Sequence, residues 1–323
     1  MNRPLILFAA GLVVLLAACS DDTTNPETRR PTDVDDVAED GAFIPGAAAL
    51  IGAWDPDDNI KEPFDFDVGY NDIGDGSLDR LSDFLDSSTA THDTVLITWE
   101  PWLWTPEQSE PVALAEIIDG SYEEVIISWA QIIDSQGDLE VLLRPAPRMD
   151  VMGVYPWSGG EAEEYQEYWR HIVDVFREEE VENVKWVWSP GGAADSLDYY
   201  PGDEYVDMVG LIVNVAAAWE EPGADGGFRP FATIVKPLID QFSSLQKPFV
   251  AAEVAIDLET EEQEREWMLA MLDTLRDDSA GIEMLAYVND DYPGDDLAID
   301  WHLLPGPQRL FEEALRETSA VAG

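Results

Sequence analysis

Charged residues of this chain stand where short apolar runs end, a pattern that suits acid–base or nucleophilic chemistry. Glu253 closes the run Phe249–Ala252 as its only carboxylate, and Glu100 follows Trp99 at the end of another run. A third run leads into the segment Arg144–Asp150, which holds two arginines and one aspartate. Such groups can attack or protonate a substrate, but a lone carboxylate after a buried run can also belong to a structural ion pair.

Tryptophans and tyrosines gather in the same places. A flat ring with an apolar face and a polar edge suits stacking on a sugar, while the alternative is that such rings belong to the core. We expect about half of the set to line a cleft. The set comprises Trp99, Trp102, Trp104, Tyr155, Trp157, Trp188, Trp219, Tyr287 and Trp301. Trp129, Trp169, Trp186 and Trp267 are assigned to packing instead.

Eight apolar runs that resemble buried strands alternate with amphipathic helical stretches, which predicts an α/β fold, a single-domain (β/α)8 TIM barrel. The runs are Ala47–Ala53, Phe64–Gly69, Thr94–Trp99, Leu139–Arg144, Val184–Trp188, Val206–Val213, Pro248–Glu253 and Ile282–Val288, of which Phe64–Gly69 is the weakest. The helical stretches include Tyr122–Ser135, Ala162–Glu179, Phe231–Leu245 and Glu261–Arg276. A doubly wound sheet also alternates. A barrel is favoured because the charged and aromatic residues follow the strands, and barrels hold their active sites at that face.

The charge of the chain excludes one class of partner. It holds 17 basic and 68 acidic residues, for a formal net charge of −51. Nucleic acids and anionic membrane surfaces repel such a protein, so we expect neither to bind it directly. A carboxylate-rich surface keeps a protein hydrated in concentrated salt, where self-repulsion is screened. Adaptation to high salt is therefore favoured over a cation-binding role.

The first residues predict export. Arg3 precedes the apolar run Leu5–Leu16, and Ala17 and Ala18 lead into Cys19, the only cysteine of the chain. Residues 1–18 therefore resemble the signal peptide of a bacterial lipoprotein, in which Cys19 is lipidated; an ordinary signal peptide is the alternative. Residues 19–42 form an acidic, flexible tether, and residues 43–323 form the barrel. We expect a lipoprotein of the cell envelope or cell surface, anchored to the membrane through Cys19.

Separated motifs make the barrel segment recognisable. They are Thr98–Trp102, Gly120–Tyr122, Trp157, Tyr168–Ile172, Asn183–Pro190 and Tyr200–Asp207. In order and spacing, from Gly52 to about Trp301, they resemble glycoside hydrolase family 26 of clan A. The resemblance implies a retaining β-mannanase-like enzyme, or one for another β-linked glycan, that needs no cofactor. It also implies a glutamate acid/base after the fourth strand and a glutamate nucleophile after the seventh.

The resemblance places the nucleophile on Glu253 and the acid/base position on Arg148. The family pattern reads Arg-Pro-x-His-Glu-Met-Asn-Gly, whereas Arg144–Asp150 reads Arg-Pro-Ala-Pro-Arg-Met-Asp. Asn214 stands near the place of a family tyrosine that accompanies the nucleophile. Because arginine holds its proton above a pKa of about 12, it cannot act as a general acid. We therefore expect Arg148 to pair with Glu253 and hydrolysis to be impaired.

Two main functions stay open, with a structural lipoprotein that lacks glycan affinity as a third. One is a pseudoenzyme that binds β-mannan or a related β-glycan at the cell surface. The other is an active endo-β-mannanase-type glycosidase that uses Glu253 and a surrogate acid, Asp150 or Glu100. Substrate contacts are expected from Trp99, Glu100, Trp102, Arg144, Tyr155, Trp157, Trp188, Asn214, Tyr287 and Trp301.

The sequence gives little reason to expect a metal. The acidic runs Asp55–Asp58, Asn71–Asp79 and Asn289–Asp296 lack the full spacing of a calcium loop, so solvated loops are favoured. The histidines His92, His171 and His302 show no metal-ligand spacing, and His302 is a candidate to border the cleft.

Overall fold

The computed structural model of the chain describes residues 49–322, except residues 75, 105–108, 220–222, 224–226, 277–280 and 291–298. The expected signal peptide, Cys19 and the tether lie outside the described residues, as does the expected start of the barrel at residue 43, and they stay predictions. Within the described part of the chain, no helix combines the length and the apolar character that crossing a membrane requires.

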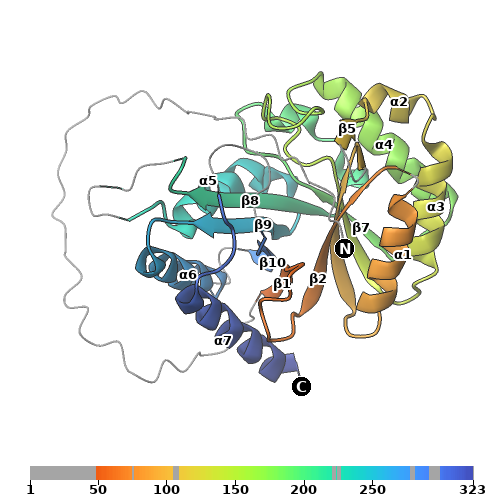
Figure 1. Cartoon of the computed structure of the whole chain (residues 1–323). Helices are drawn as coiled ribbons and strands as arrows, with labels where there is room; N and C mark the ends of the chain where they lie inside the picture. Colours follow the sequence, from red (N-terminus) through yellow and green to blue (C-terminus); the bar gives the residue numbers. More distant parts are fainter. Residues whose placement is uncertain are drawn as a thin grey trace, which may run out of the picture.

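Eight parallel strands close into a barrel, which confirms the predicted fold (Figure 1). Around the barrel they follow the order β1-β10-β9-β8-β7-β6-β3-β2. Their bounds are β1 Leu50–Trp54, β2 Phe66–Asp72, β3 Thr94–Glu100, β6 Glu140–Pro145, β7 Val184–Trp188, β8 Met208–Ala216, β9 Phe249–Asp257 and β10 Ile282–Val288. The weakest predicted strand, β2, pairs with β3 over six residues, from Asp67 to Asp72.

Two strands run beyond their predicted ends. The prediction ended one strand at Val213 and another at Glu253, but β8 continues to Ala216 and β9 to Asp257. The two stay paired to their ends, with Ala216 opposite Asp257. Glu253 therefore lies inside a strand, in a rigid segment. A short antiparallel hairpin, β4 (Trp102–Trp104) with β5 (Ser109–Pro111), follows β3 and was not predicted.

Helices surround the barrel, as Figure 1 shows for α1 beside β2, with α3 beyond α1, and for α6 and α7 below β9. Their bounds are α1 Ser77–Ser88, α2 Leu114–Ile118, α3 Glu123–Asp134, α4 Ala162–Glu178, α5 Phe231–Phe242, α6 Glu261–Leu275 and α7 Pro305–Ala322. Short 3-10 helices lie at η1 Ser196–Tyr199, η2 Asp203–Tyr205 and η3 Ser243–Leu245. In α4 the apolar residues that recur at helical spacing, such as Tyr165, Trp169 and Ile172, are all buried, as an amphipathic helix requires.

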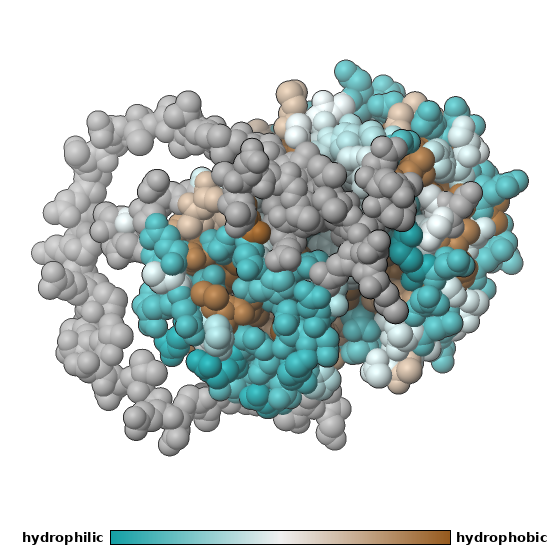
Figure 2. Space-filling view, viewed as in Figure 1, coloured by the Kyte–Doolittle hydropathy of each residue, from teal (hydrophilic) through white to brown (hydrophobic). Residues whose placement is uncertain are grey.

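The core has two layers, because alternate residues of a strand face the barrel interior and the helices. The inner layer comprises Phe66, Val68, Leu96, Leu142, Val187, Met208, Val250, Ala252, Met284 and Ala286. Gly52 of β1 has to be small, since a Cβ there would lie 2.5 Å from the carbonyl oxygen of Phe66. Hydrophilic residues dominate the visible surface around α6 and α7 (Figure 2), as the net charge of the chain predicts.

Candidate functional site

A bulge in β9 turns Glu253 toward the barrel interior. Val250 and Ala252 face the inner layer, while Ala251 and Val254 belong to the outer core. The register with β8 shifts between Leu211 and Ile212, so Ala252 is skipped in the pairing. A bulge lets two successive side chains point to one face, and Glu253 follows Ala252 inward. Strand β9 thus fixes the carboxylate at the site where the sequence places the nucleophile.

Three side chains donate hydrogen bonds to the Glu253 carboxylate. Arg144 Nη2 lies 2.5 Å from Glu253 Oε2, and Arg148 Nη2 lies 2.8 Å from Oε1. Asn214 Nδ2 donates to the same Oε1 at 2.8 Å. The predicted pairing of Arg148 with Glu253 is therefore present, and Asn214 also lies beside the carboxylate, as the sequence predicted.

The electrostatics of this cluster keep Glu253 ionised. Burial raises the pKa of Glu253, but the charges of Arg148 and Arg144 and the hydrogen bonds from Arg144 and Asn214 lower it to about 2. Burial likewise lowers the pKa of Arg144, and the charge of Glu253 reverses that effect, so its net direction is upward. Glu253 and Arg144 therefore stay charged across the physiological range.

Arg144 has a different role from the one predicted. Its side chain is fully buried and its Nη1 also donates to the Ala252 carbonyl oxygen, at 2.7 Å. A guanidinium with no exposed surface cannot contact a polysaccharide. Arg144 instead holds Glu253 and the bulge in place, and the predicted substrate contact is wrong.

The loop that carries Arg148 is built around unusual backbone conformations. Ala146 and Arg148 both have positive φ angles, 40° and 57°, which cost free energy in residues that have a side chain. Arg148 N donates to the Ser189 carbonyl at 2.9 Å, and Ser158 Oγ donates to the Arg148 carbonyl at 2.7 Å. These bonds offset the strain and hold the guanidinium over Glu253.

Asp150 is not placed to act as an acid. Its Oδ1 accepts a hydrogen bond from Gly191 N at 2.6 Å, and its Oδ2 accepts from Ala193 N at 2.9 Å and from Ser196 Oγ at 2.5 Å. The carboxylate is thereby committed to ordering the loop after β7. The prediction of Asp150 as a surrogate acid conflicts with this arrangement.

Glu100 lies in the same charged centre but is buried, with only 1% of its surface exposed. Burial raises its pKa, the charge of Glu253 adds to the effect and Arg144 opposes it, with a result of about 8. Glu100 therefore holds its proton at neutral pH. The burial of Glu100 is at odds with the predicted contact to substrate. Because Glu100 is protonated, however, it has the proton that a general acid needs.

Tyr70 belongs to this centre and was missed in the sequence. Burial raises the pKa of the Tyr70 phenol, and the negative charges of Glu253 and Glu100 raise it further. The positive charges of Arg144 and Arg148 oppose this rise. Tyr70 follows Phe66 and Val68 at strand spacing on the inner face of β2. The alternation of Phe66, Val68 and Tyr70 along the strand could have identified Tyr70 as an inward-facing residue. It was overlooked because this strand was the weakest one predicted.

Most of the aromatic residues predicted to contact substrate are packed inside the protein. Trp99 is 1% exposed and stacks on Trp129 with ring centroids 4.3 Å apart, and Trp188 is 0% exposed and packs on Phe242. Tyr287 is equally buried against Phe311. Trp301 is 3% exposed and lies edge-on to Trp219. Stacking on a sugar is therefore contradicted for Trp99, Trp188, Tyr287 and Trp301. Trp129, Trp169, Trp186 and Trp267 are buried, as predicted.

The aromatic residues that remain near the centre lie on two sides of it. Tyr155 and Trp157 stack with centroids 4.5 Å apart, and Trp102 meets Trp157 edge-on at 6.0 Å. All three are buried to more than 90%. On the other side the half-buried Trp54, which the sequence analysis missed, lies edge-on to Tyr70 at 5.5 Å. It ends β1, where a lone tryptophan gave no pattern.

Comparisons with known proteins show similarity to one family of glycoside hydrolases. Residues 95–239 match the family model described as glycosyl hydrolase family 26. Endoglucanase H of Acetivibrio thermocellus is 30% identical over 172 residues, which cover 50% of this chain and 18% of that protein. The chain thus spans less than a fifth of that relative's length.

Two solved structures share the fold. A GH26 β-mannanase from Bacteroides ovatus superposes with a TM-score of 0.58 at 16% identity, covering 83% of this chain and 88% of that one. GH26C from Muricauda sp. superposes with a TM-score of 0.60 at 17% identity, covering 83% and 85%. At these identities the likeness is one of fold.

Proposed function

We infer that this chain is a member of glycoside hydrolase family 26, and we propose that it binds β-mannan or a related β-glycan without measurable hydrolysis. The observation that carries the proposal is the Glu253 carboxylate held by Arg148 and Arg144. The β-mannanase of Bacteroides ovatus and the family match along residues 95–239 support the class of substrate.

Hydrolysis with retention requires two carboxyl groups about 5–5.5 Å apart, one as nucleophile and one as acid and then base. In our proposal Glu253 is the nucleophile and Arg148 stands at the acid/base position, as the sequence resemblance implies. An arginine neither donates a proton to the leaving oxygen nor activates water at neutral pH. Losing a positioned general acid costs about 10²–10⁴ in rate.

The nucleophile is weakened as well. Oε1 of Glu253 accepts hydrogen bonds from Arg148 and Asn214, and Oε2 accepts one from Arg144. To attack a sugar carbon, Oε1 has to give up its charge-assisted bond from Arg148, a guanidinium that the family pattern lacks, whereas the arginine at the position of Arg144 belongs to that pattern. Both half-reactions therefore lose rate, while the barrel keeps its fold.

An active enzyme is the second candidate, and one observation favours it. Glu100 holds a proton at neutral pH, with a pKa of about 8, as a general acid must. Its 1% exposure stands against this role, because a proton donor has to lie within hydrogen-bond reach of the glycosidic oxygen. We therefore favour binding over catalysis.

Binding would use the aromatic residues that flank the charged centre. Trp54 offers a partly exposed ring at the end of β1, whereas Trp102, Tyr155 and Trp157 form a packed group after β3 and β6 with little exposed surface. Rings of this kind present apolar faces to sugar C–H groups. Lipidation of Cys19 and the tether 19–42 would hold the barrel at the cell surface, where polymers are met.

The test compares the natural protein with Arg148→Glu, which restores a carboxyl at the proposed acid/base position. Binding to β-mannan is measured by depletion from solution, and release of reducing ends is followed in the same molar salt. Trp54→Ala is the variant for the binding surface, and Tyr205→Ala is its control, a half-buried aromatic residue on η2, ahead of β8.

We expect the natural protein to bind without turnover and Trp54→Ala to bind at least tenfold more weakly. Arg148→Glu should gain hydrolysis that is lost again when Glu253→Gln is added. Natural-protein turnover that Glu100→Gln abolishes would favour the active enzyme. An absence of affinity for β-glycans in every variant would overturn both functions.

A further inference from the structure

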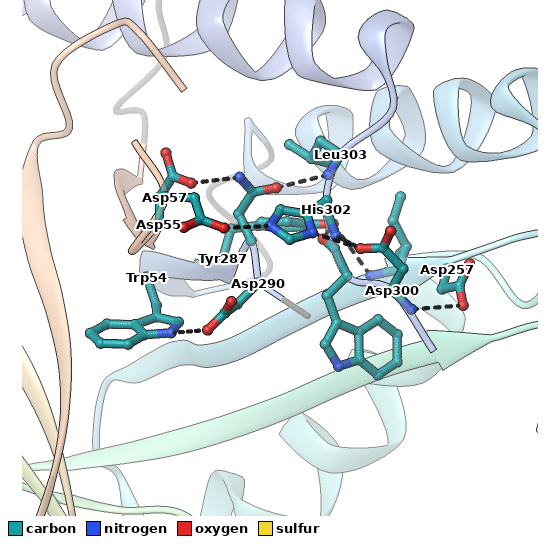
Figure 3. A network of polar contacts seen from close by, with 12 residues as sticks. Trp54, Asp55, Asp57, Asp257, Tyr287, Asp290, Asp300, His302 and Leu303 are labelled. Atoms are coloured by element: carbon teal, nitrogen blue, oxygen red, sulfur yellow. Dashed lines mark hydrogen bonds and ion pairs between the residues drawn. The ribbon is translucent and has the colours of Figure 1, made fainter. Parts of the chain in front are cut away.

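Three segments that the sequence analysis treated separately come together beyond the ends of β1 and β10. They are the acidic run after β1, the Asn289–Asp290 turn after β10, and the residues that lead into α7. Asp57, Asp290 and His302 each offer one ligand atom, and all three atoms lie within 4.8 Å of one another (Figure 3). His302 Nε2 lies 3.8 Å from Asp57 Oδ2.

His302 is oriented as a metal-ligating histidine is. Its Nδ1 lies 2.7 Å from Asp300 Oδ1, and its Nε2 lies on the side of Asp57. Asp300 is held in turn, since its backbone N donates to Asp257 Oδ2 at 3.2 Å. A carboxylate behind the imidazole is the usual second partner of a histidine that binds a metal.

Asp290 is also held from behind. Trp54 Nε1 donates to Asp290 Oδ2 at 3.0 Å, and Trp301 N donates to the Asp290 carbonyl at 3.2 Å. Asn289 bridges the segments, with Nδ2 donating to Asp55 Oδ1 and Oδ1 accepting from Leu303 N, both at 2.8 Å. The backbone that carries the three ligands is thereby fixed before any ion arrives.

A cavity of about 370 Å³ opens at the same place, lined by Asp57, Asn59, Asn289, His302, Leu303 and Gln308. An ion and its waters need far less room than this. Tetrahedral ligands about 2.0–2.1 Å from a zinc ion lie roughly 3.3–3.5 Å apart, so the 3.8 Å separation of His302 and Asp57 requires only a small contraction.

We propose that Asp57, Asp290 and His302 bind a divalent transition-metal ion, with Zn²⁺ as the best match. One imidazole nitrogen and two carboxylates suit zinc, whereas calcium and magnesium prefer oxygen ligands alone. Water fills the fourth position, for which the 44% exposure of the Asp57 side chain leaves access. This site is separate from the Glu253 centre and does not depend on the proposed function.

The position of the ion gives it a structural task. β1 and β10 are neighbours where the barrel closes, with Trp54 opposite Val288. An ion held by Asp57 after β1, Asp290 after β10 and His302 before α7 ties the first strand to the last. Because these ligands meet only in the folded chain, the ion binds the native state and stabilises it by its binding free energy. The site thus stabilises the closure of the barrel.

The test uses the full chain, stripped with a chelator and titrated with ZnCl₂ by calorimetry in molar KCl with excess MgCl₂, which saturates ordinary surface carboxylates. The variants are His302→Ala and the milder Asp57→Asn. His171→Ala is the matched control, because His171 on α4 is also a half-buried histidine beside a carboxylate, 3.0 Å from Glu123. Melting temperatures are recorded with and without zinc.

We expect one Zn²⁺ per chain and a rise of roughly 5 °C in melting temperature at about 100 times the Kd. Both site variants should bind at least tenfold more weakly and lose the rise, with unchanged melting temperatures in chelator, while His171→Ala behaves as the natural protein. Binding unaffected by His302→Ala and Asp57→Asn, no stoichiometric zinc, or tighter binding of Ca²⁺ than Zn²⁺ would overturn the proposal.

Discussion

Replacing Glu253 with glutamine should destabilise the barrel, although the change is nearly isosteric. The glutamine leaves Arg144, which is fully buried, without its counter-charge, and removes one partner of Arg148. Removing one member of a buried ion pair typically costs about 3–5 kcal/mol. In many active sites the opposite is found, because catalytic groups are held at a cost to stability.

The pKa of Glu253 sets the size and the pH dependence of this effect. A folded-state pKa of about 2, against an ordinary value of 4.5, corresponds to about 3 kcal/mol of stability. Because the folded pKa is the lower one, this stability is fully present above pH 4.5 and is lost as the pH falls toward 2. By pH 3 about 2 kcal/mol of it has gone.

The assay is urea unfolding of the natural protein and Glu253→Gln, at pH 7, 5, 4 and 3 in molar KCl. The other carboxylates contribute equally to both proteins, so they cancel in the difference between the two free energies of unfolding. That difference should shrink by about 2 kcal/mol from pH 7 to pH 3. Arg148→Gln should cost less at pH 7, because the Arg148 side chain is 19% exposed and Arg144 still pairs with Glu253. A difference that is constant with pH, or a glutamine variant more stable than the natural protein at pH 7, would refute the reasoning.

Three further predictions concern the rest of the molecule. Burial raises the pKa of Glu264 to about 7, so its ionisation destabilises the folded protein as the pH rises. In urea unfolding, the stability of Glu264→Gln relative to the natural protein should therefore grow from pH 5 to pH 8, by up to about 3 kcal/mol. A difference that falls with pH would contradict this. Asp150→Ala should cost about 2–4 kcal/mol, since it leaves Gly191 N and Ala193 N without their acceptor, and proteolysis should become faster in the loop after β7; an unchanged cleavage pattern would count against it. With a net charge of −51, the chain should lose several degrees of melting temperature when KCl is lowered from 2 M to 0.1 M, and a salt-independent melting temperature would contradict adaptation to salt.

The barrel could be predicted because its strands are buried on both faces and read as continuous apolar runs. The ends of β8 and β9 could not, since Asn214 and Glu253 are polar residues inside strands and look like strand ends. The ion pair between Arg148 and Glu253 was foreseen from the resemblance and the charges. The bulge at Ala252 that aims Glu253 inward has no sequence signal of its own.

The aromatic residues show the opposite case. Trp99 and Trp188 follow apolar runs, as substrate-stacking residues would, but the helices pack over them. Sequence position alone does not separate a ring that faces the barrel mouth from one that faces α3 or α5. Asp57, Asp290 and His302 lie as much as 245 positions apart, so only the closure of β1 against β10 could bring them together.

The central claim is that the charged centre around Glu253 binds a glycan without cleaving it. The most direct measurement is reducing-end release from β-mannan by the natural protein in molar salt, beside Glu253→Gln and with depletion binding on the same samples. Our account predicts that both proteins bind the polymer and that their release of reducing ends is the same. Release by the natural protein that Glu253→Gln abolishes would contradict it.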